Sequence, residues 1–162
     1  MAKSKTSSKS SRNAANLLED IKAIISEIQE LYCQDKLPWI VGYSGGKDST
    51  AAFQLVWYAI ADLHPDKRTK TIYVITTDTM VENPIVSAWV AKSLDLMKIA
   101  AQEQKIPIEP ILLKPAVKDT FWVNLIGKGY PAPRQSFRWC TERLKIKPSD
   151  KYIREKIRES GE

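Results

Sequence analysis

Cysteine is scarce in this sequence. Only Cys33 and Cys140 occur among 162 residues, far apart and without a CxxC or Cys/His pattern. We therefore expect neither a disulfide framework nor a complete metal site within this chain. Long apolar runs are also missing, because no stretch approaches the roughly 20 residues that a membrane-spanning helix needs. The sequence thus predicts neither a small disulfide-stapled domain nor a membrane protein.

The amino-terminal segment lacks apolar residues that could form a leader or an anchor. Residues 1–12 contain four basic side chains and five serines, unlike a signal peptide. We expect a disordered basic arm over 1–12 and a cytoplasmic protein. The 162 residues, 43% of them hydrophobic, suffice for a single core, so we place one domain at 13–162. The net charge of +6 suits a nucleotide or a nucleic acid, although charge also serves solubility.

Hydrophobic spacing predicts strands that alternate with helices. Apolar residues at three-four spacing or in short β-branched runs indicate helices over 13–34, 48–63 and 84–104, and strands over 39–43, 71–77 and 108–113. The predicted fold class is α/β, a doubly wound parallel sheet with flanking helices. In such sheets ligands bind beyond the carboxyl ends of the strands, next to the switch in strand order. After Lys114 we expect an irregular, surface-mounted substrate region, followed by a helix that starts near Asp150.

A glycine-containing loop follows the first predicted strand. Residues 40–50 read IVGYSGGKDST. A Walker P-loop is excluded, because Val41 stands where its first glycine should be and Asp48 follows the lysine where a hydroxyl residue is needed. Gly45 and Gly46 can nevertheless aim backbone N–H groups at one anion. The following helix adds the positive end of its dipole.

The side chains of this loop suit a pyrophosphate group. Ser44 and Ser49 can donate hydroxyl hydrogen bonds, and Lys47 can neutralise a leaving pyrophosphate. Asp48 is compatible with phosphate if Mg²⁺ lies between them. The alternative is a tight strand-to-helix turn in which Asp48 or Ser49 caps the helix.

The second predicted strand ends in Thr76-Thr77-Asp78-Thr79. We expect this segment, with Thr77 and Asp78 as its binding residues, to border the adenine and ribose of a nucleotide. Asp78 would contact a ribose hydroxyl or join the metal shell. The alternative is an ordinary loop that leads into a helix cap at Asn83-Pro84.

A basic segment, GYPAPRQSFRWCTERLKIKP, occupies residues 129–148. Cys140 has Arg138, Arg143 and Lys145 within five positions, and nearby cations favour a thiolate if the segment folds them inward. A thiolate can carry sulfur as a persulfide, attack an adenylated group or bind a metal. The alternative is a small buried cysteine beside Trp139 and Leu144.

The loop and the basic segment together resemble a known superfamily. Residues 44–49 match the SGGxDS signature of the PP-loop ATP pyrophosphatases, and RWCTERLKIKP follows about ninety residues later. This pair of motifs resembles the phosphoadenosine-phosphosulfate reductase superfamily. The amino-acid sequence from Asn13 to Asp150 is similar to that of the DNA phosphorothioation sulfurtransferases in this superfamily. The resemblance implies an adenine nucleotide alpha hydrolase-like fold that cleaves ATP between its α and β phosphates.

The resemblance also implies substrates, cofactors and partners. ATP and Mg²⁺ would serve to adenylate a DNA phosphate, and Cys140 would relay sulfur from a cysteine desulfurase within a complex of several subunits. A 4Fe–4S cluster is expected from the family, but its downstream cysteines are absent here, so we expect a truncated chain. The alternatives are a reductase of adenylylated sulfate and a non-catalytic nucleotide-binding subunit. Side chains expected to hold the DNA backbone are Arg134, Arg138, Arg143, Lys145 and Lys147.

Overall fold

The centre of the protein is a three-stranded parallel sheet. The computed structural model describes residues 5–160, and the strands follow one another across the sheet in chain order. Val41 pairs with Val74, and Ile75 pairs with Ile111. The predicted α/β class with a parallel sheet and flanking helices is therefore confirmed. The strands are β1 (Trp39–Gly42), β2 (Ile72–Thr77) and β3 (Ile108–Leu113).

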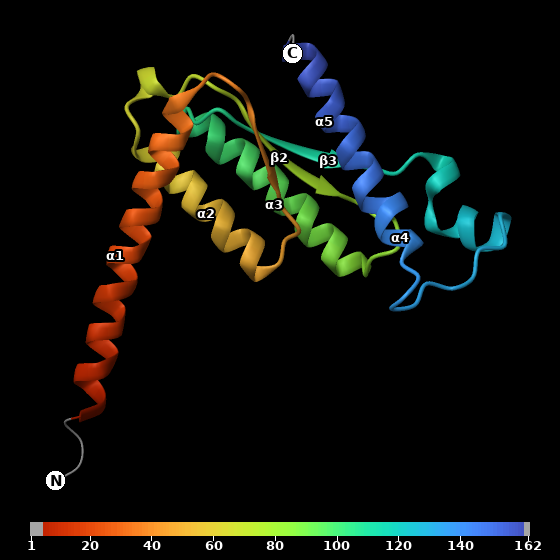
Figure 1. Cartoon of the computed structure of the whole chain (residues 1–162), viewed down its shortest axis with the longest axis horizontal. Coiled ribbons are helices and arrows are strands. Elements are labelled where there is room, and N and C mark those ends of the chain that lie inside the picture. Colours follow the sequence, from red (N-terminus) through yellow and green to blue (C-terminus); the bar gives the residue numbers. More distant parts are fainter. Residues whose placement is uncertain (1–4, 161–162) are drawn as a thin grey trace.

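Helical elements connect and cover the strands (Figure 1). The α-helices are α1 (Lys5–Gln34), α2 (Lys47–Asp62), α3 (Pro84–Glu103), α4 (Trp139–Thr141) and α5 (Lys147–Ser160). Short 3₁₀ turns occur at η1 (Pro65–Lys67) and η2 (Val117–Asp119), and π-type turns at η3 (Val123–Gly127) and η4 (Glu142–Ile146). Within residues 5–160, no helix combines the length and hydropathy that a bilayer span requires.

The main core lies between one face of the sheet and helices α2 and α3. Ile72 and Val74 of the central strand are fully buried and belong to one cluster with Phe53 of α2 and Leu94 of α3. Their alternation along β2 follows the two-residue period of a strand. Burial of each of these side chains contributes about 1.5–3 kcal/mol to the free energy of unfolding. The two helices that follow β1 and β2 thus share one face.

Helix α5 lies against the other face of the sheet. The ring of Tyr73 on β2 contacts the ring of Tyr152 at a centroid distance of 5.9 Å, and the amine of Lys156 lies over the Tyr73 ring. Helices therefore flank both faces. The strand order β1-β2-β3 contains no reversal, however, so residues 5–160 do not contain the switch point at which a doubly wound sheet is expected to bind its ligand.

Helix α1 begins earlier than the sequence predicted. It starts at Lys5, so residues 5–12, which we expected to be disordered, are helical, and residues 1–4 lie outside the described part. Adding one residue to an existing helix costs much less free energy than nucleating a new helix. The helix formed by the amphipathic segment after Asn13 therefore extends into the polar residues before it. At its other end α1 is anchored by Tyr32, whose hydroxyl donates to the carbonyl of Lys70 over 2.7 Å.

The carboxyl-terminal third is more helical than predicted. Helical turns run from Trp139 to Ser160, so the helix expected near Asp150 begins within the basic segment, and the irregular region is shorter. A proline inside a helix lacks an N–H group and crowds the carbonyl four residues earlier. The wider η4 turn directly precedes the turn that contains Pro148, which accommodates the proline without ending the helix.

Candidate functional site

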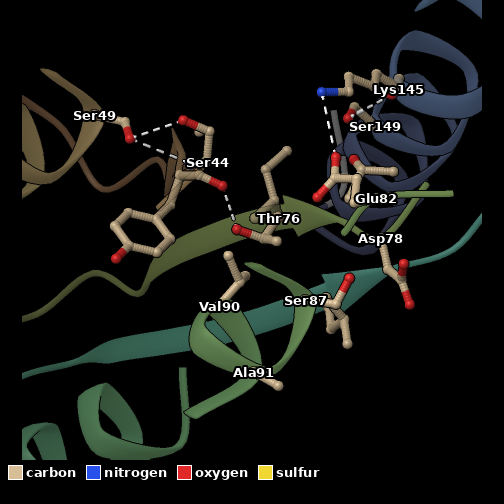
Figure 2. A pocket seen from close by; sticks show the side chains of 15 residues that line it. Ser44, Ser49, Thr76, Asp78, Glu82, Ser87, Val90, Ala91, Lys145 and Ser149 are labelled. Atoms are coloured by element: carbon tan, nitrogen blue, oxygen red, sulfur yellow. Dashed lines mark hydrogen bonds and ion pairs between the residues drawn. The ribbon is translucent and has the colours of Figure 1, made fainter. Parts of the chain in front are cut away.

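A pocket of about 460 Å³ opens at the carboxyl ends of β1 and β2 (Figure 2). It takes residues from the glycine loop, from both strand ends, from the first turns of α3 and from the helical segment that leads into α5. This is the edge at which parallel α/β sheets bind ligands. Its polar or charged lining side chains are Ser44, Ser49, Thr76, Thr77, Asp78, Glu82, Ser87, Lys145 and Ser149.

The glycine loop has a conformation that only glycine adopts readily. Gly45 has a φ of +73°, and a Cβ atom there would lie 2.8 Å from Cγ2 of Val90 on α3. The left-handed backbone and the close approach both require the missing side chain. Within the loop, the hydroxyls of Ser44 and Ser49 are 3.0 Å apart, and that of Ser49 donates to the carbonyl of Gly46. Two predicted phosphate-binding hydroxyls are thus adjacent.

Lys47 and Asp48 occupy the first turn of α2. Both side chains are exposed and neither lines the pocket, so the structure does not bring the predicted catalytic lysine and metal ligand into it. The alternative of a side-chain cap is wrong, because the N-cap residue is Gly46 and no side chain caps the helix. The first N–H groups of a helix have no partner within the helix, which suits an anion at this end.

The ends of β1 and β2 are joined by a side-chain hydrogen bond. The hydroxyl of Thr76 donates to the carbonyl of Tyr43, which couples the glycine loop to the second predicted binding segment. Thr77 and Asp78 line the pocket as expected from their positions. Asp78 also accepts from the backbone N–H of Met80 over 2.9 Å, while the α3 cap belongs to Asn83. Both the binding and the turn interpretation of Asp78 therefore have support.

Glu82 and Lys145 meet in the pocket, and sequence reasoning missed this pair. The Lys145 amine lies 3.7 Å from a carboxylate oxygen of Glu82, as Figure 2 shows. We expected Lys145 to contact DNA, but it lines the same pocket as Ser44 and Thr77. No spacing rule connects positions so far apart in the chain. Glu82 carried one weak signal, since it follows Asp78 by four residues just before a helix start.

Arg143 is engaged by protein groups rather than directed to solvent. Its guanidinium donates to Asp119 over 2.8 Å and to the hydroxyl of Tyr130 over 2.7 Å, and it stacks on the Tyr130 ring. Arg143 therefore holds the preceding segment, and its predicted contact with DNA stays a prediction. Lys147 lies 3.9 Å from the same Asp119 carboxylate.

Arg134 and Arg138 are exposed, and within residues 5–160 neither forms an ion pair. Neither guanidinium group has a carboxylate partner in this part of the chain, and the contact of both with DNA stays a prediction. Their positions precede α4, on the segment that leads into the carboxyl-terminal helical run.

The two cysteines lie on different elements. Cys140 is half-buried in α4 and does not line the pocket, while Cys33 is exposed on α1. Two of the three cations expected to favour a thiolate at Cys140 are paired with carboxylates, because Arg143 pairs with Asp119 and Lys145 with Glu82. The sulfur-carrying role of Cys140 stays a prediction.

Comparisons with known proteins identify a distant relative. No protein-family model matches the chain. It is similar to an uncharacterized protein of Methanocaldococcus jannaschii, with 30% identity over 131 residues. The match covers 81% of this chain and 23% of the relative, so the chain spans less than a quarter of the length of that curated protein.

Proposed function

We propose that this domain binds ATP in the pocket at the ends of β1 and β2 and splits it into AMP and pyrophosphate, as PP-loop ATP pyrophosphatases do. The observation that carries the proposal is the position of the glycine loop. Its paired Ser44 and Ser49 line this pocket, and the constrained Gly45 directly follows Ser44. The match of residues 44–49 to the SGGxDS signature supports pyrophosphate as the group that the loop binds.

The dimensions and lining of the pocket suit an adenine nucleotide. Its volume of about 460 Å³ falls within the usual range for small-molecule sites. Ile75, Val90 and Leu112 supply an apolar wall for the base, whereas Ser44, Ser49 and Lys145 supply donors for phosphate. A lysine on the side away from the loop would allow the two ends of a triphosphate chain to be bound separately.

The residues at the pocket fit a magnesium ion bound together with the nucleotide. Mg²⁺ is commonly held by one or two carboxylates plus substrate phosphates, and Asp78 and Glu82 both line the pocket. No group of three or more metal-ligating side chains occurs among the described residues, so the phosphates would complete the shell. The ion would supply charge neutralisation on the leaving pyrophosphate. Asp48 would join this shell only if the loop closes around the nucleotide.

An iron–sulfur cluster does not fit the cysteines of this chain. A 4Fe–4S cluster usually needs four thiolates, and the two present here lie on separate helices, with Cys33 exposed and Cys140 half-buried.

The proposed reaction begins with transfer of AMP to a DNA phosphate. A non-bridging oxygen of the phosphodiester attacks the α-phosphorus of ATP, the bond to the β-phosphate bridging oxygen breaks, and pyrophosphate leaves. Lys47 and the first-turn N–H groups of α2 would stabilise the charge that develops on pyrophosphate. Lys145 would orient the α-phosphate once it is released from Glu82.

The second step replaces AMP with sulfur, in the manner of DndC, the DNA phosphorothioation sulfurtransferase that the chain resembles. The terminal sulfur of a Cys140 persulfide, charged by a cysteine desulfurase, attacks the activated phosphorus and AMP leaves. A thiol supplied by another subunit or by a small-molecule reductant then attacks the Cys140 sulfur. It forms a disulfide with Cys140, the original sulfur–sulfur bond breaks, and the outer sulfur stays on phosphorus as the phosphorothioate. Because Cys140 does not line the pocket, the DNA phosphate would have to lie between the pocket and α4, with other subunits holding the duplex.

One observation favours a second candidate function. Lys47 and Asp48 lie outside the pocket, as they would in a subunit that binds a nucleotide without cleaving it. Such a protein would need the pocket and Lys145 to bind the nucleotide, but it would not need Lys47 and Asp48 to cleave it.

Product analysis separates these functions. The chain is incubated with Mg²⁺, DNA and ATP labelled on the α-phosphate, and the products are resolved by chromatography. We expect labelled AMP, free or on DNA, with pyrophosphate. Lys47→Ala should reduce its formation at least about 10-fold, while Lys36→Ala, which removes an exposed lysine before β1, should not.

Other products would contradict the proposal in distinct ways. Labelled ADP would show cleavage at the wrong bond. Tight ATP binding without cleavage would support the non-catalytic subunit. Cleavage of ATP that persists in Lys47→Ala would remove Lys47 from the reaction. Neither binding nor cleavage of ATP, together with binding of adenylyl sulfate, would favour the reductase-like alternative.

A further inference from the structure

An exposed tryptophan stands at the end of a stack of aromatic rings in the segment between β3 and α5. Trp139 is buried and stacks on Phe121, with a centroid distance of 5.4 Å and an interplanar angle of 23°. Phe121 in turn contacts Trp122 at 5.1 Å in a perpendicular arrangement. The Trp122 side chain is nevertheless 57% exposed. Its ring is thus supported from within the protein and open to solvent.

The segment that carries Trp122 is held by polar contacts rather than by a large core. Asn124 is fully buried and donates to the carbonyl of Thr120 over 2.8 Å. Arg143 joins the carboxyl-terminal helical run to Asp119 in the same segment. These bonds fix the backbone on both sides of Trp122, so its exposure belongs to a defined structure. A large ring that is fixed before binding loses little conformational entropy when a ligand stacks on it.

A second exposed ring lies in a tight turn beside two arginines. Two backbone hydrogen bonds, of 3.2 and 2.8 Å, join Arg134 and Phe137. Phe137 is 44% exposed, and Arg138 follows it directly. The turn therefore presents an aromatic side chain between two guanidinium groups in sequence.

The positive charge of the protein is concentrated in the same part of the chain. Residues 114–147, here called the basic lobe, contain eight basic and two acidic side chains, a net charge of +6 that equals that of the whole chain. In Figure 1 the first part of this lobe extends from the edge of the domain beyond α4. Lys118, Arg134 and Arg138 are exposed and form no ion pair among the described residues.

We propose that the basic lobe binds single-stranded DNA, with one base stacked on Trp122 and the backbone held by Lys118, Arg134 and Arg138. Exposed aromatic rings interleaved with cations are the usual means by which proteins bind single strands without sequence preference. A base in a duplex is covered by its neighbours on both faces and cannot stack on a side chain. The preference for unpaired strands therefore follows from Trp122, and the affinity for phosphate from the cations.

This inference deepens the proposed function, because it specifies the form in which DNA reaches the pocket. Lys145 belongs both to the basic lobe and to the pocket lining, so a strand bound along the lobe would pass close to the bound nucleotide. A phosphate next to an unstacked base would be the one presented for adenylation.

Fluorescence anisotropy with a labelled 20-nucleotide oligothymidine, without ATP, tests the inference. We expect tighter binding than to a 20-base-pair duplex at the same salt concentration. Trp122→Ala should weaken single-strand binding about 5- to 150-fold, the range for loss of one stacked base, whereas Trp122→Phe should retain most of it. Tyr58→Ala is the matched control, because Tyr58 on α2 is 58% exposed and lies outside the lobe.

Salt titration separates stacking from charge. Trp122→Ala should leave the slope of log affinity against log salt unchanged, while Arg134→Ala and Arg138→Ala should each reduce it by about 0.7. Circular dichroism melting confirms that each variant is folded. An unfolded Trp122→Ala is replaced by Trp122→Leu, and an unfolded arginine variant by Arg134→Gln or Arg138→Gln, because these changes remove the ring or the charge but keep more of the side-chain volume.

Several results would overturn the inference. These are wild-type affinity in Trp122→Ala, equal affinity for duplex and single strand, and binding to anionic lipid vesicles without binding to DNA. Preference for an RNA oligonucleotide of the same sequence would also overturn it. The anisotropy assay contains no ATP, so a negative result in it does not bear on AMP formation. If AMP does not form but single-stranded DNA still binds through Trp122, only the proposed function is contradicted.

Discussion

The amine of Lys145 lies 3.7 Å from the carboxylate of Glu82. The two residues are far apart in the sequence, because Glu82 directly precedes α3 and Lys145 precedes α5. Their ion pair links the two segments that border the pocket. A bound phosphate would compete with Glu82 for the same amine, so this pair connects nucleotide binding to the position of the carboxyl-terminal helical run.

Removal of Lys145 should weaken nucleotide binding. A charge-assisted hydrogen bond contributes about 1.5–3 kcal/mol, so Lys145→Met should raise the Kd for Mg-ATP about 10- to 150-fold in titration calorimetry. Lys151→Met is the control, because Lys151 is exposed and pairs with Glu155 on the surface of α5, away from the pocket lining. An unchanged Kd in Lys145→Met would exclude this lysine from the nucleotide site.

Alanine at Gly45 should destabilise the protein, whereas alanine at Gly42 should not. The left-handed conformation at Gly45 costs a non-glycine residue about 1–2 kcal/mol, and the added Cβ would also overlap Val90. At Gly42 nothing lies within 4 Å of a new Cβ. Urea unfolding should show the difference. The double variant Gly45→Ala/Val90→Ala removes the overlap, although it also removes core packing. The prediction is contradicted if Gly45→Ala is as stable as wild type.

The anchor of α1 should make stability depend on pH in the acid range. The buried amine of Lys70 contacts Asp35 over 2.7 Å, and this hydrogen bond, followed by that from the Leu37 N–H, lowers the pKa of Asp35 below its ordinary value of 3.8. The carboxylate therefore stabilises the fold above about pH 4, and the contribution is lost as the pH falls through the folded-state pKa. Asp35→Asn should be less stable than wild type at pH 7, with the difference disappearing toward pH 2. A difference that is the same at both pH values would contradict this linkage.

Breaking the pair between Asp119 and Arg143 should loosen the basic lobe. Both side chains are mostly buried, and Asp119→Asn would leave the guanidinium without its counter-charge, which we expect to cost about 1–3 kcal/mol. Glu155→Gln removes an exposed partner of Lys151 and should cost at most about 1 kcal/mol. Hydrogen exchange should rise at residues 117–130 in Asp119→Asn alone. Protection equal to wild type would show that other contacts hold the lobe.

The sequence by itself determined the three strands, helices α2 and α3, and their order. Strand residues such as Ile72 and Val74 alternate locally, and the apolar residues of α2 and α3 recur every three or four positions, so their spacing predicted both strands and helices to within a few residues. Gly45 was identifiable for a similar reason, because its requirement for a left-handed backbone is local. These predictions depended only on neighbours along the chain, and they held. Two other local predictions did not, because residues 5–12 are helical and no side chain caps α2.

Only the tertiary structure decided which charged groups meet. Lys145 and Arg143 are two residues apart in one basic segment and had the same predicted role, yet one lines the pocket beside Glu82 and the other pairs with Asp119. Their separation arises because a helix rotates residues two positions apart to different faces, and the η4 turn alters that rotation. Coulomb attraction depends on distance in space rather than along the chain, so the partner of each cation was set by the packing of the helical run against the sheet.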